Sequence, residues 1–230
     1  MVDNAAPSDF SFILASCIQD MKSSLGMMLE SQASMREVCP PQDPEQVKAY
    51  AVLEYETARI NSELVQLASL YRLEHDNLLV QVDEHYVSDV LEEQLARNEL
   101  LFKNRGIQLT VNCDENLTWY FDGELIGDVI NIVLVNCSRY CRKQVHVSIE
   151  KQQNMLCISI ADDGSGYPET MLAAPGEIAP DGLFLSGSPR LGVLFACRIA
   201  NLHHLKGIHG FVQLENSGVL NGGVFRLFLP

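Results

Sequence analysis

The sequence has no long apolar run and no basic stretch that leads into one. Its apolar segments are short, and Asn131 interrupts the one at 130–135. A membrane-spanning helix needs about 20 apolar residues, so no span is expected. Residues 1–10 do not have the pattern of a secretory signal. By elimination, the sequence predicts a cytoplasmic protein.

Basic residues are few, since 16 Lys and Arg stand against 30 Asp and Glu, for a net charge of −14. No basic cluster stands out along the chain. Nucleic acids and anionic membranes are bound mainly through Lys and Arg, so we expect the protein to bind neither. The composition favours a protein partner.

Cysteines in a metal-binding arrangement are also lacking. The seven cysteines are odd in number and scattered. Cys137 and Cys141 are four residues apart, but no second Cys or His pair has a convincing zinc spacing. Reduced thiols inside apolar segments are the favoured interpretation, which agrees with a cytoplasmic protein.

Two coiled-coil patterns are present in the first third of the chain. Apolar residues recur at alternating steps of three and four over 10–36 and again up to about residue 74, and the prolines of 39–44 separate the two stretches. The seam residues are Leu14, Ile18, Met21, Leu25, Met28, Gln32, Met35, Tyr50, Leu53, Thr57, Ile60, Leu64, Leu67 and Tyr71. The pattern predicts a dimerising helical hairpin over residues 8–75.

A lone hairpin buries only one side of each seam. Pairing with a second copy would form a four-helix bundle and complete the core, so we expect a homodimer. The alternative is that the hairpin packs on the C-terminal domain of its own chain.

Residues 76–230 show helices among short strands. Period-two or apolar strand patterns and 3.6-residue helical patterns follow one another, with no internal repeat. Strands are predicted at 79–82, 107–111, 117–121, 145–149, 156–160, 210–214 and 224–229, and helices at 87–102, 123–141 and 191–203. The fold class predicted is α+β, with helices on one face of a mixed sheet.

Three short segments in this region carry candidate chemistry. Asn136–Tyr140 ends a helix with an amide that can ligate Mg²⁺ and a basic residue one turn later, a pattern also common on helix surfaces. Asp162–Pro168 follows a strand with a carboxylate and two glycines, which suit either ligand approach or an ordinary turn. Gly187–Val193 opens a helix, where backbone N–H groups can receive phosphate or simply form a capping loop.

In this order and spacing, the three segments resemble the N box and the two glycine boxes of the GHKL ATPase fold of histidine kinases. The ending Gly222–Pro230 is similar to the closing strand of that domain, and Gln19–Leu25 is similar to the H-box of the dimerisation helix. The resemblance implies an ATP-binding domain over 76–230 behind a dimerisation hairpin, as in a sensor-kinase core with no sensor or membrane segment.

The resemblance also implies roles for single residues. Asn136 would be the Mg²⁺ ligand and Asp162 the contact to adenine. The remaining nucleotide contacts would come from Arg139, Tyr140, Gly164, Gly166, Arg190 and Gly192. Residues 169–190 would form a lid over ATP.

Four positions depart from the family pattern. Gln19 stands at the place of the phosphoacceptor histidine, beside Asp20, Lys22 and Ser23, and an amide cannot take a phosphoryl group as imidazole does. Ser23 also stands where phosphatase-competent members carry Thr or Asn. The other two departures lie in the nucleotide site: Ile132 replaces the first asparagine of the N box and Arg190 the first glycine of the second glycine box.

The favoured hypothesis is a degenerate histidine-kinase-like protein of a two-component pathway that does not autophosphorylate. It would act as a dimeric regulator, binding ATP weakly or not at all, and dock a response-regulator receiver domain or a partner histidine kinase near Gln19, Lys22 and Ser23. One alternative is an ATP-binding enzyme that phosphorylates or dephosphorylates a response regulator. A third reading is one subunit of a heterodimer.

Overall fold

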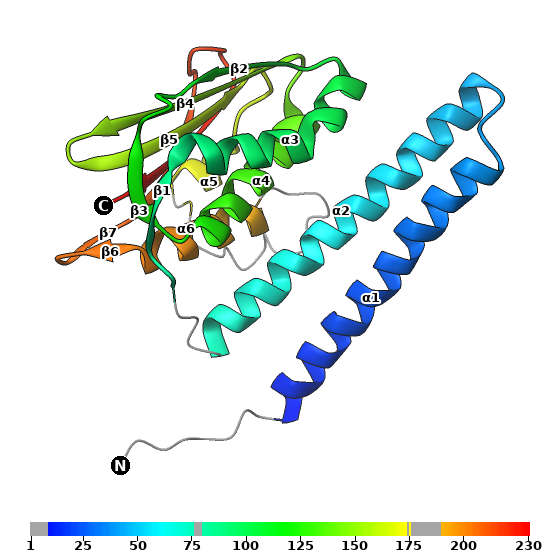
Figure 1. Ribbon diagram of the computed structural model, residues 1–230, viewed down its shortest axis with the longest axis horizontal. Helices are drawn as coiled ribbons and strands as arrows, with labels where there is room; N and C mark the ends of the chain where they lie inside the picture. The colour runs from blue at the N-terminus through cyan, green and yellow to red at the C-terminus, as the bar shows by residue number, and fades with distance from the viewer. Residues whose placement is uncertain (1–8, 76–79, 174, 176–189) are drawn as a thin grey trace. The chain divides into compact units, whose positions relative to one another are not determined.

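The computed structural model describes residues 9–75, 80–173, 175 and 190–230. The chain divides into two compact units, Met1–Leu78 and Leu79–Pro230. Figure 1 shows the first unit as two helices in blue and cyan and the second as a sheet with helices in green to red.

The first unit is the helical hairpin. Helix α1 (Asp9–Val38) and helix α2 (Pro44–His75) run antiparallel and are joined by a short connection (Figure 1). Asp43 caps α2, since its Oδ1 accepts the N–H of Gln46 at 2.8 Å. Pro44 follows in the first turn, where its missing N–H has no helical acceptor to lose. Both predicted helices are confirmed.

The predicted seam separates into two rows on each helix. On the side where the helices meet, Ile18, Leu25, Gln32 and Thr57 are buried. The second row lies between 40% and 53% exposed and comprises Met21, Met28 and Met35 of α1 and Leu53, Ile60 and Leu67 of α2. The hairpin therefore keeps an apolar row on each helix that contacts between α1 and α2 do not fully bury.

One polar pair lies between the two helices. Gln32 donates from Nε2 to Thr57 Oγ1 at 2.7 Å, and the Thr57 hydroxyl donates to the carbonyl oxygen of Leu53 at 2.8 Å. The amide is satisfied only in part, because the buried Oε1 of Gln32 has no hydrogen-bond partner among the described residues. The Nε2 bond still favours one axial register of α1 against α2.

The second unit is built on a five-stranded mixed sheet in the order β2-β4-β5-β9-β8. Strands β2 and β4 are parallel, and the other neighbours are antiparallel. The strands are β2 (Gln108–Asn112), β4 (Gln144–Gln152), β5 (Met155–Asp162), β8 (Phe211–Asn216) and β9 (Gly223–Leu229). Two short antiparallel pairs complete the unit: β1 (Asp83–Tyr86) with β3 (Thr118–Phe121), and β6 (His204–Leu205) with β7 (Ile208–His209).

Three helices cover one face of this sheet (Figure 1): α3 (Val87–Arg105), α4 (Gly123–Tyr140) and α6 (Arg190–Leu202). A five-residue helix, α5 (Glu169–Ala173), follows β5. The core lies between the helices and the central strands, where the fully buried side chains include Ile158, Ile160, Phe225, Leu227, Phe195 and Ile199. The predicted α+β class with a mixed sheet is confirmed.

The strand predicted at 79–82 is wrong. Residues 80–82 form no strand, residue 79 lies outside the described residues, and the first strand is β1 at Asp83–Tyr86. Pairing with β3 sets this register, because His85 lies opposite Trp119 and its ring packs at 5.2 Å from that of Phe121. The N–H of Gln81 is donated to a side chain, Asp122 Oδ2, at 2.9 Å, so it makes no ladder bond.

A buried histidine joins the start of α4 to the end of α6. Asp122 accepts the N–H of Leu125 at 3.0 Å as the N-cap of α4, and its own N–H donates to His203 Nε2 at 3.0 Å. This leaves the proton of the neutral ring on Nδ1, which donates to the carbonyl oxygen of Ile199 at 2.8 Å. Burial lowers the pKa of His203, against smaller opposing effects of the Ile199 carbonyl and Asp122.

Acid is expected to destabilise the second unit through His203. Because the folded pKa is lowered, the neutral ring contributes its full stability above the unfolded pKa of about 6.5, and this contribution falls as the pH drops below that value. Urea denaturation at pH 7.5 and pH 5 should show this loss in the wild type and less of it in His203→Gln, whose amide oxygen can accept the Asp122 N–H without titrating. His204→Gln, at an exposed neighbour, is the control. Equal loss in all three proteins would contradict this assignment.

Among the described helices, none combines the length and the apolar character required to cross a bilayer.

Candidate functional site

The loop after β5 contacts the end of α4. A Cβ atom on Gly164 would lie 2.4 Å from the carbonyl oxygen of Tyr140 and 2.7 Å from Asp162 Oδ1, so only glycine fits there. The segments Asn136–Tyr140 and Asp162–Pro168, which are separate in the sequence, therefore meet in the structure.

Asp162 lies buried at the end of β5. Its Oδ1 accepts the N–H of Gly164 at 2.6 Å, and its carboxylate also accepts the N–H of Gly223 at the start of β9. Burial raises the pKa of Asp162; the two N–H groups oppose this shift and the Asp163 charge adds to it. The carboxylate thus holds its own loop against β9.

Asp163 has a different set of partners. Its carboxylate accepts the backbone N–H of Arg142 at 2.7 Å and that of Lys143 at 3.0 Å, just before β4. Partial burial alone would raise the pKa of Asp163, but the N–H groups of Lys143, Gln144 and Arg142 together hold it below its usual value. Asp163 therefore caps the entry to β4.

The second glycine of the loop and Asn216 fix the residue that follows. Gly166 has a φ of +77°, and a Cβ there would lie 2.4 Å from Asn216 Oδ1. Asn216, at the end of β8, accepts the N–H of Tyr167 at 2.7 Å and donates to its carbonyl oxygen at 2.9 Å. This paired bond holds the backbone of Tyr167 in one position.

The N-box residues lie on the last turns of α4. Asn136 and Arg139 are half-buried, and Tyr140 is exposed. Ile132, which replaces the first asparagine of the motif, is 6% exposed and belongs to the core.

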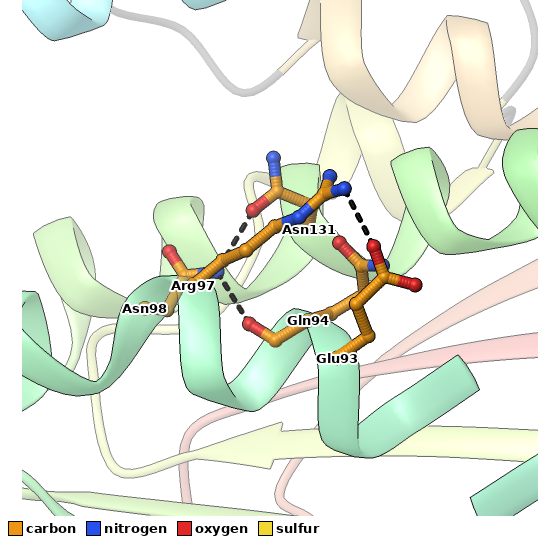
Figure 2. A network of polar contacts seen from close by, with 5 residues as sticks. All are labelled: Glu93, Gln94, Arg97, Asn98 and Asn131. Carbon is orange, nitrogen blue, oxygen red and sulfur yellow. Dashed lines mark hydrogen bonds and ion pairs between the residues drawn. The ribbon is translucent and has the colours of Figure 1, made fainter. Parts of the chain in front are cut away.

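Asn131 does not replace the amide missing at Ile132. It accepts the Asn98 Nδ2 N–H at 2.8 Å and so faces α3, as Figure 2 shows. The same Nδ2 group also donates to the carbonyl oxygen of Gln94 at 2.8 Å, and on the neighbouring turn Arg97 pairs with Glu93 at 2.6 Å (Figure 2). The amide of Asn131 therefore serves the packing of α4 against α3, whereas the Arg97–Glu93 pair is an exposed contact within α3.

The third segment is described only in part. Arg190 is the first residue of α6, and Gly192 is buried in its first turn. Residues 187–189 lie outside the described residues. Of the expected lid over 169–190, residues 169–173 form α5, and 174 and 176–189 lie outside the described residues.

The candidate docking residues lie on α1 in the first unit. Gln19 is exposed, as expected from its place next to the buried Ile18, and Asp20, Lys22 and Ser23 are exposed too. The Ser23 hydroxyl donates to the carbonyl oxygen of Gln19 at 3.0 Å, one helical turn back. This bond ties the Ser23 hydroxyl to the helix backbone.

The fit of Mg²⁺ and ATP to these residues is mixed. Asn136 offers a carboxamide oxygen, but no group of three or more His, Cys, Asp or Glu side chains in the described part of the chain is placed to hold a metal. At the base end the fit is poor. Asp162 already accepts two N–H groups, and the ring of Tyr167 lies beside it.

Several solved structures have a fold similar to that of this chain. The protein resembles the Acinetobacter baumannii histidine kinase AdeS with a TM-score of 0.55 and 20% identity, over 90% of this chain and 95% of that one. Full-length ShkA in complex with AMPPNP gives a TM-score of 0.65 with 16% identity over 94% of this chain and 45% of that one. The chain has the fold of a histidine-kinase core. Its second unit has the GHKL-type fold of a histidine-kinase catalytic domain, and the catalytic domain of the histidine kinase ThkA matches 65% of the chain with a TM-score of 0.55 and 20% identity.

Sequence relatives agree with this histidine-kinase-like fold. The sensor histidine kinase CssS of Bacillus subtilis is 23% identical over 180 residues, or 78% of this chain and 38% of CssS. The virulence sensor histidine kinase PhoQ of Salmonella typhimurium is 20% identical over 123 residues, or 54% of this chain and 25% of PhoQ. The chain thus spans well under half the length of these relatives. No family model matches it.

Sequence reasoning missed two residues of the site, Asn216 and Tyr167. The Asn216-Ser217-Gly218 run signals a turn but not its contact with a loop some 50 residues earlier, and Tyr167 was read only as part of a glycine loop. Gly223 begins the closing strand β9, as expected, and its N–H also binds Asp162, a contact that the sequence pattern does not indicate.

Proposed function

We propose that this histidine-kinase-like protein is a dimeric regulator of a two-component pathway that lacks a phosphoacceptor. Its α1 surface around Gln19, Lys22 and Ser23 docks the receiver domain of a response regulator or a partner histidine kinase. The observation that carries the proposal is the exposed Gln19 on α1, at the H-box position. An amide there keeps the shape of a docking surface and removes the nucleophile.

The homodimer rests on the exposed apolar rows of the hairpin. Six aliphatic or Met side chains, spaced by seven residues on each helix, lie 40–53% exposed. A second hairpin placed against these rows would bury them in a four-helix core.

The alternative of a phosphatase has less support. Water positioning needs a polar side chain that projects from α1 towards the receiver, and the Ser23 hydroxyl instead binds the Gln19 carbonyl oxygen. An ATP-dependent kinase would need the base end of the nucleotide site, where Tyr167 lies beside Asp162.

A combined binding and labelling assay tests the proposal. The chain is mixed with a panel of purified receiver domains, and separately with labelled Mg-ATP, with the CssS core as the positive control for labelling. We expect submillimolar binding to a receiver domain and no acid-labile phosphoprotein. Lys22→Glu should weaken receiver binding by about tenfold or more, because charge reversal at a contact disfavours association.

Lys48→Glu, an exposed lysine on α2, is the matched control and should bind as the wild type does. A stable acid-labile phosphoprotein, or equal binding by both charge variants, would contradict the proposal.

A further inference from the structure

The backbone of Tyr167 is fixed by contacts of neighbouring residues and not by its own side chain. It follows Gly166, whose positive φ turns the chain, and Asn216 binds both its N–H and its carbonyl oxygen. The turn at Gly166 and the two hydrogen bonds of Asn216 therefore determine the direction in which the Tyr167 side chain leaves the backbone.

The ring of Tyr167 lies beside the carboxylate of Asp162. A Cβ atom on Gly223 would lie 3.0 Å from Tyr167 Cε2 and 3.1 Å from Asp162 Oδ2, so both atoms pack over the same glycine. Gly164 borders the carboxylate on the loop side, since a Cβ atom there would lie 2.7 Å from Asp162 Oδ1. Glycines on the loop and on β9 thus leave room for a flat ring next to Asp162.

Tyr167 is half-buried as a residue. Burial raises the pKa of Tyr167 well above its usual value, and the nearby Cys137 and Asp162 add to this shift. Cys137 is itself buried on α4, directly after Asn136. The phenol therefore lies among the residues that join the N box to the first glycine box.

We propose that the Tyr167 side chain occupies the place beside Asp162 where the base of an adenine nucleotide would bind, and so excludes such nucleotides from the second unit. This inference rests on the assignment of Asp162 as the base contact. A phenol ring and a purine are both flat, largely apolar groups with a polar edge, so they compete for the same walls.

Calorimetry on the full chain tests the inference, with Mg-AMPPNP and adenosine as the probes. We expect no binding by the wild type at millimolar ligand and binding about 100-fold tighter, or more, by Tyr167→Ala. Adenosine should show the same gain in affinity, since the substitution opens the part of the site that would hold the base. Tyr167→Phe keeps the ring and should stay closed. Tyr120→Ala, which removes a 61% exposed tyrosine on β3, is the control and should behave as the wild type.

A second variant guards against misfolding. Tyr167→Leu keeps apolar contact with Gly223 and still shortens the side chain, and thermal unfolding reports whether each variant folds. In the Tyr167→Ala background, Asp162→Asn should reverse the gain for adenosine, because an amide presents a donor as well as an acceptor. Folded variants that gain no binding, or a wild type that binds as tightly as they do, would overturn the inference. Failure to gain binding leaves the docking function intact, whereas autophosphorylation of the wild type would overturn that function itself.

Discussion

A monomeric hairpin protein is the expected result of replacing Met28 and Ile60 together by glutamate. Both side chains belong to the exposed rows and are 48% and 41% exposed within one chain, so the substitutions should leave the fold of the chain intact. In a four-helix bundle the same positions face the partner. Each dimer would then bury four carboxylates without partners, at several kcal/mol in all.

We expect the dissociation constant of the dimer to rise by about 1,000-fold or more, which corresponds to about 4 kcal/mol. Sedimentation velocity at micromolar concentration measures it. Met27→Glu with Val52→Glu is the matched control, because these residues precede members of the rows and are 62% and 53% exposed. A wild-type protein that sediments as a monomer would contradict the proposed dimer. A control variant that also dissociates would show that the exposed rows are not the interface.

Replacing Gly222 by alanine should cause the largest loss of stability among the glycine substitutions. Its Cβ would lie 2.3 Å from the carbonyl oxygen of Asp162 and 2.6 Å from the N–H nitrogen of Gly164. Both are backbone atoms, and Asp162 ends β5, which is paired with β4 and β9. The Asp162 carbonyl cannot move without disturbing the end of the central strand β5, so we expect a loss of about 3 kcal/mol in unfolding free energy.

Gly106→Ala separates this clash from backbone strain. Gly106 has a φ of +65° at the C-cap of α3, and a Cβ there would meet nothing within 4 Å. It should lose only about 1 kcal/mol, from the left-handed conformation. Chemical denaturation of the two variants gives the comparison. Equal losses would mean that the contact at Gly222 relaxes easily.

The sequence predicted the helices and the central strands because their patterns are local. The apolar seam of the hairpin repeats with the helical period, and the buried residues of β4 alternate along the strand. Strands β5 and β9 are short, almost continuously buried apolar runs, which is also a local signal. The strand predicted at 79–82 failed because its position depends on β3, about 35 residues later, and on the side chain of Asp122. Strand β6 and its partner β7 are only two residues each, too short for any periodic signal.

The motifs of the candidate site could be predicted from the sequence, but how well its residues suit a nucleotide could not. The carboxylate and glycines of 162–166 were recognisable from spacing, and the structure brings that loop against Tyr140. What the loop does with Tyr167 depends on Asn216 and Gly223, which come from two later strands. Contacts between distant segments leave no mark at the spacing of a motif, so the sequence could not show that an aromatic ring lies beside Asp162.

The packing of α4 also bears on how the N box could change over evolutionary time. Ile132 is 6% exposed, and the neighbouring amide of Asn131 is bonded to Asn98. An Ile132→Asn substitution would introduce a carboxamide among apolar neighbours, and leaving it unsatisfied costs about 1–3 kcal/mol. A lineage that acquired asparagine at this position would first have to tolerate a less stable protein. Selection for stability therefore opposes a polar side chain at residue 132.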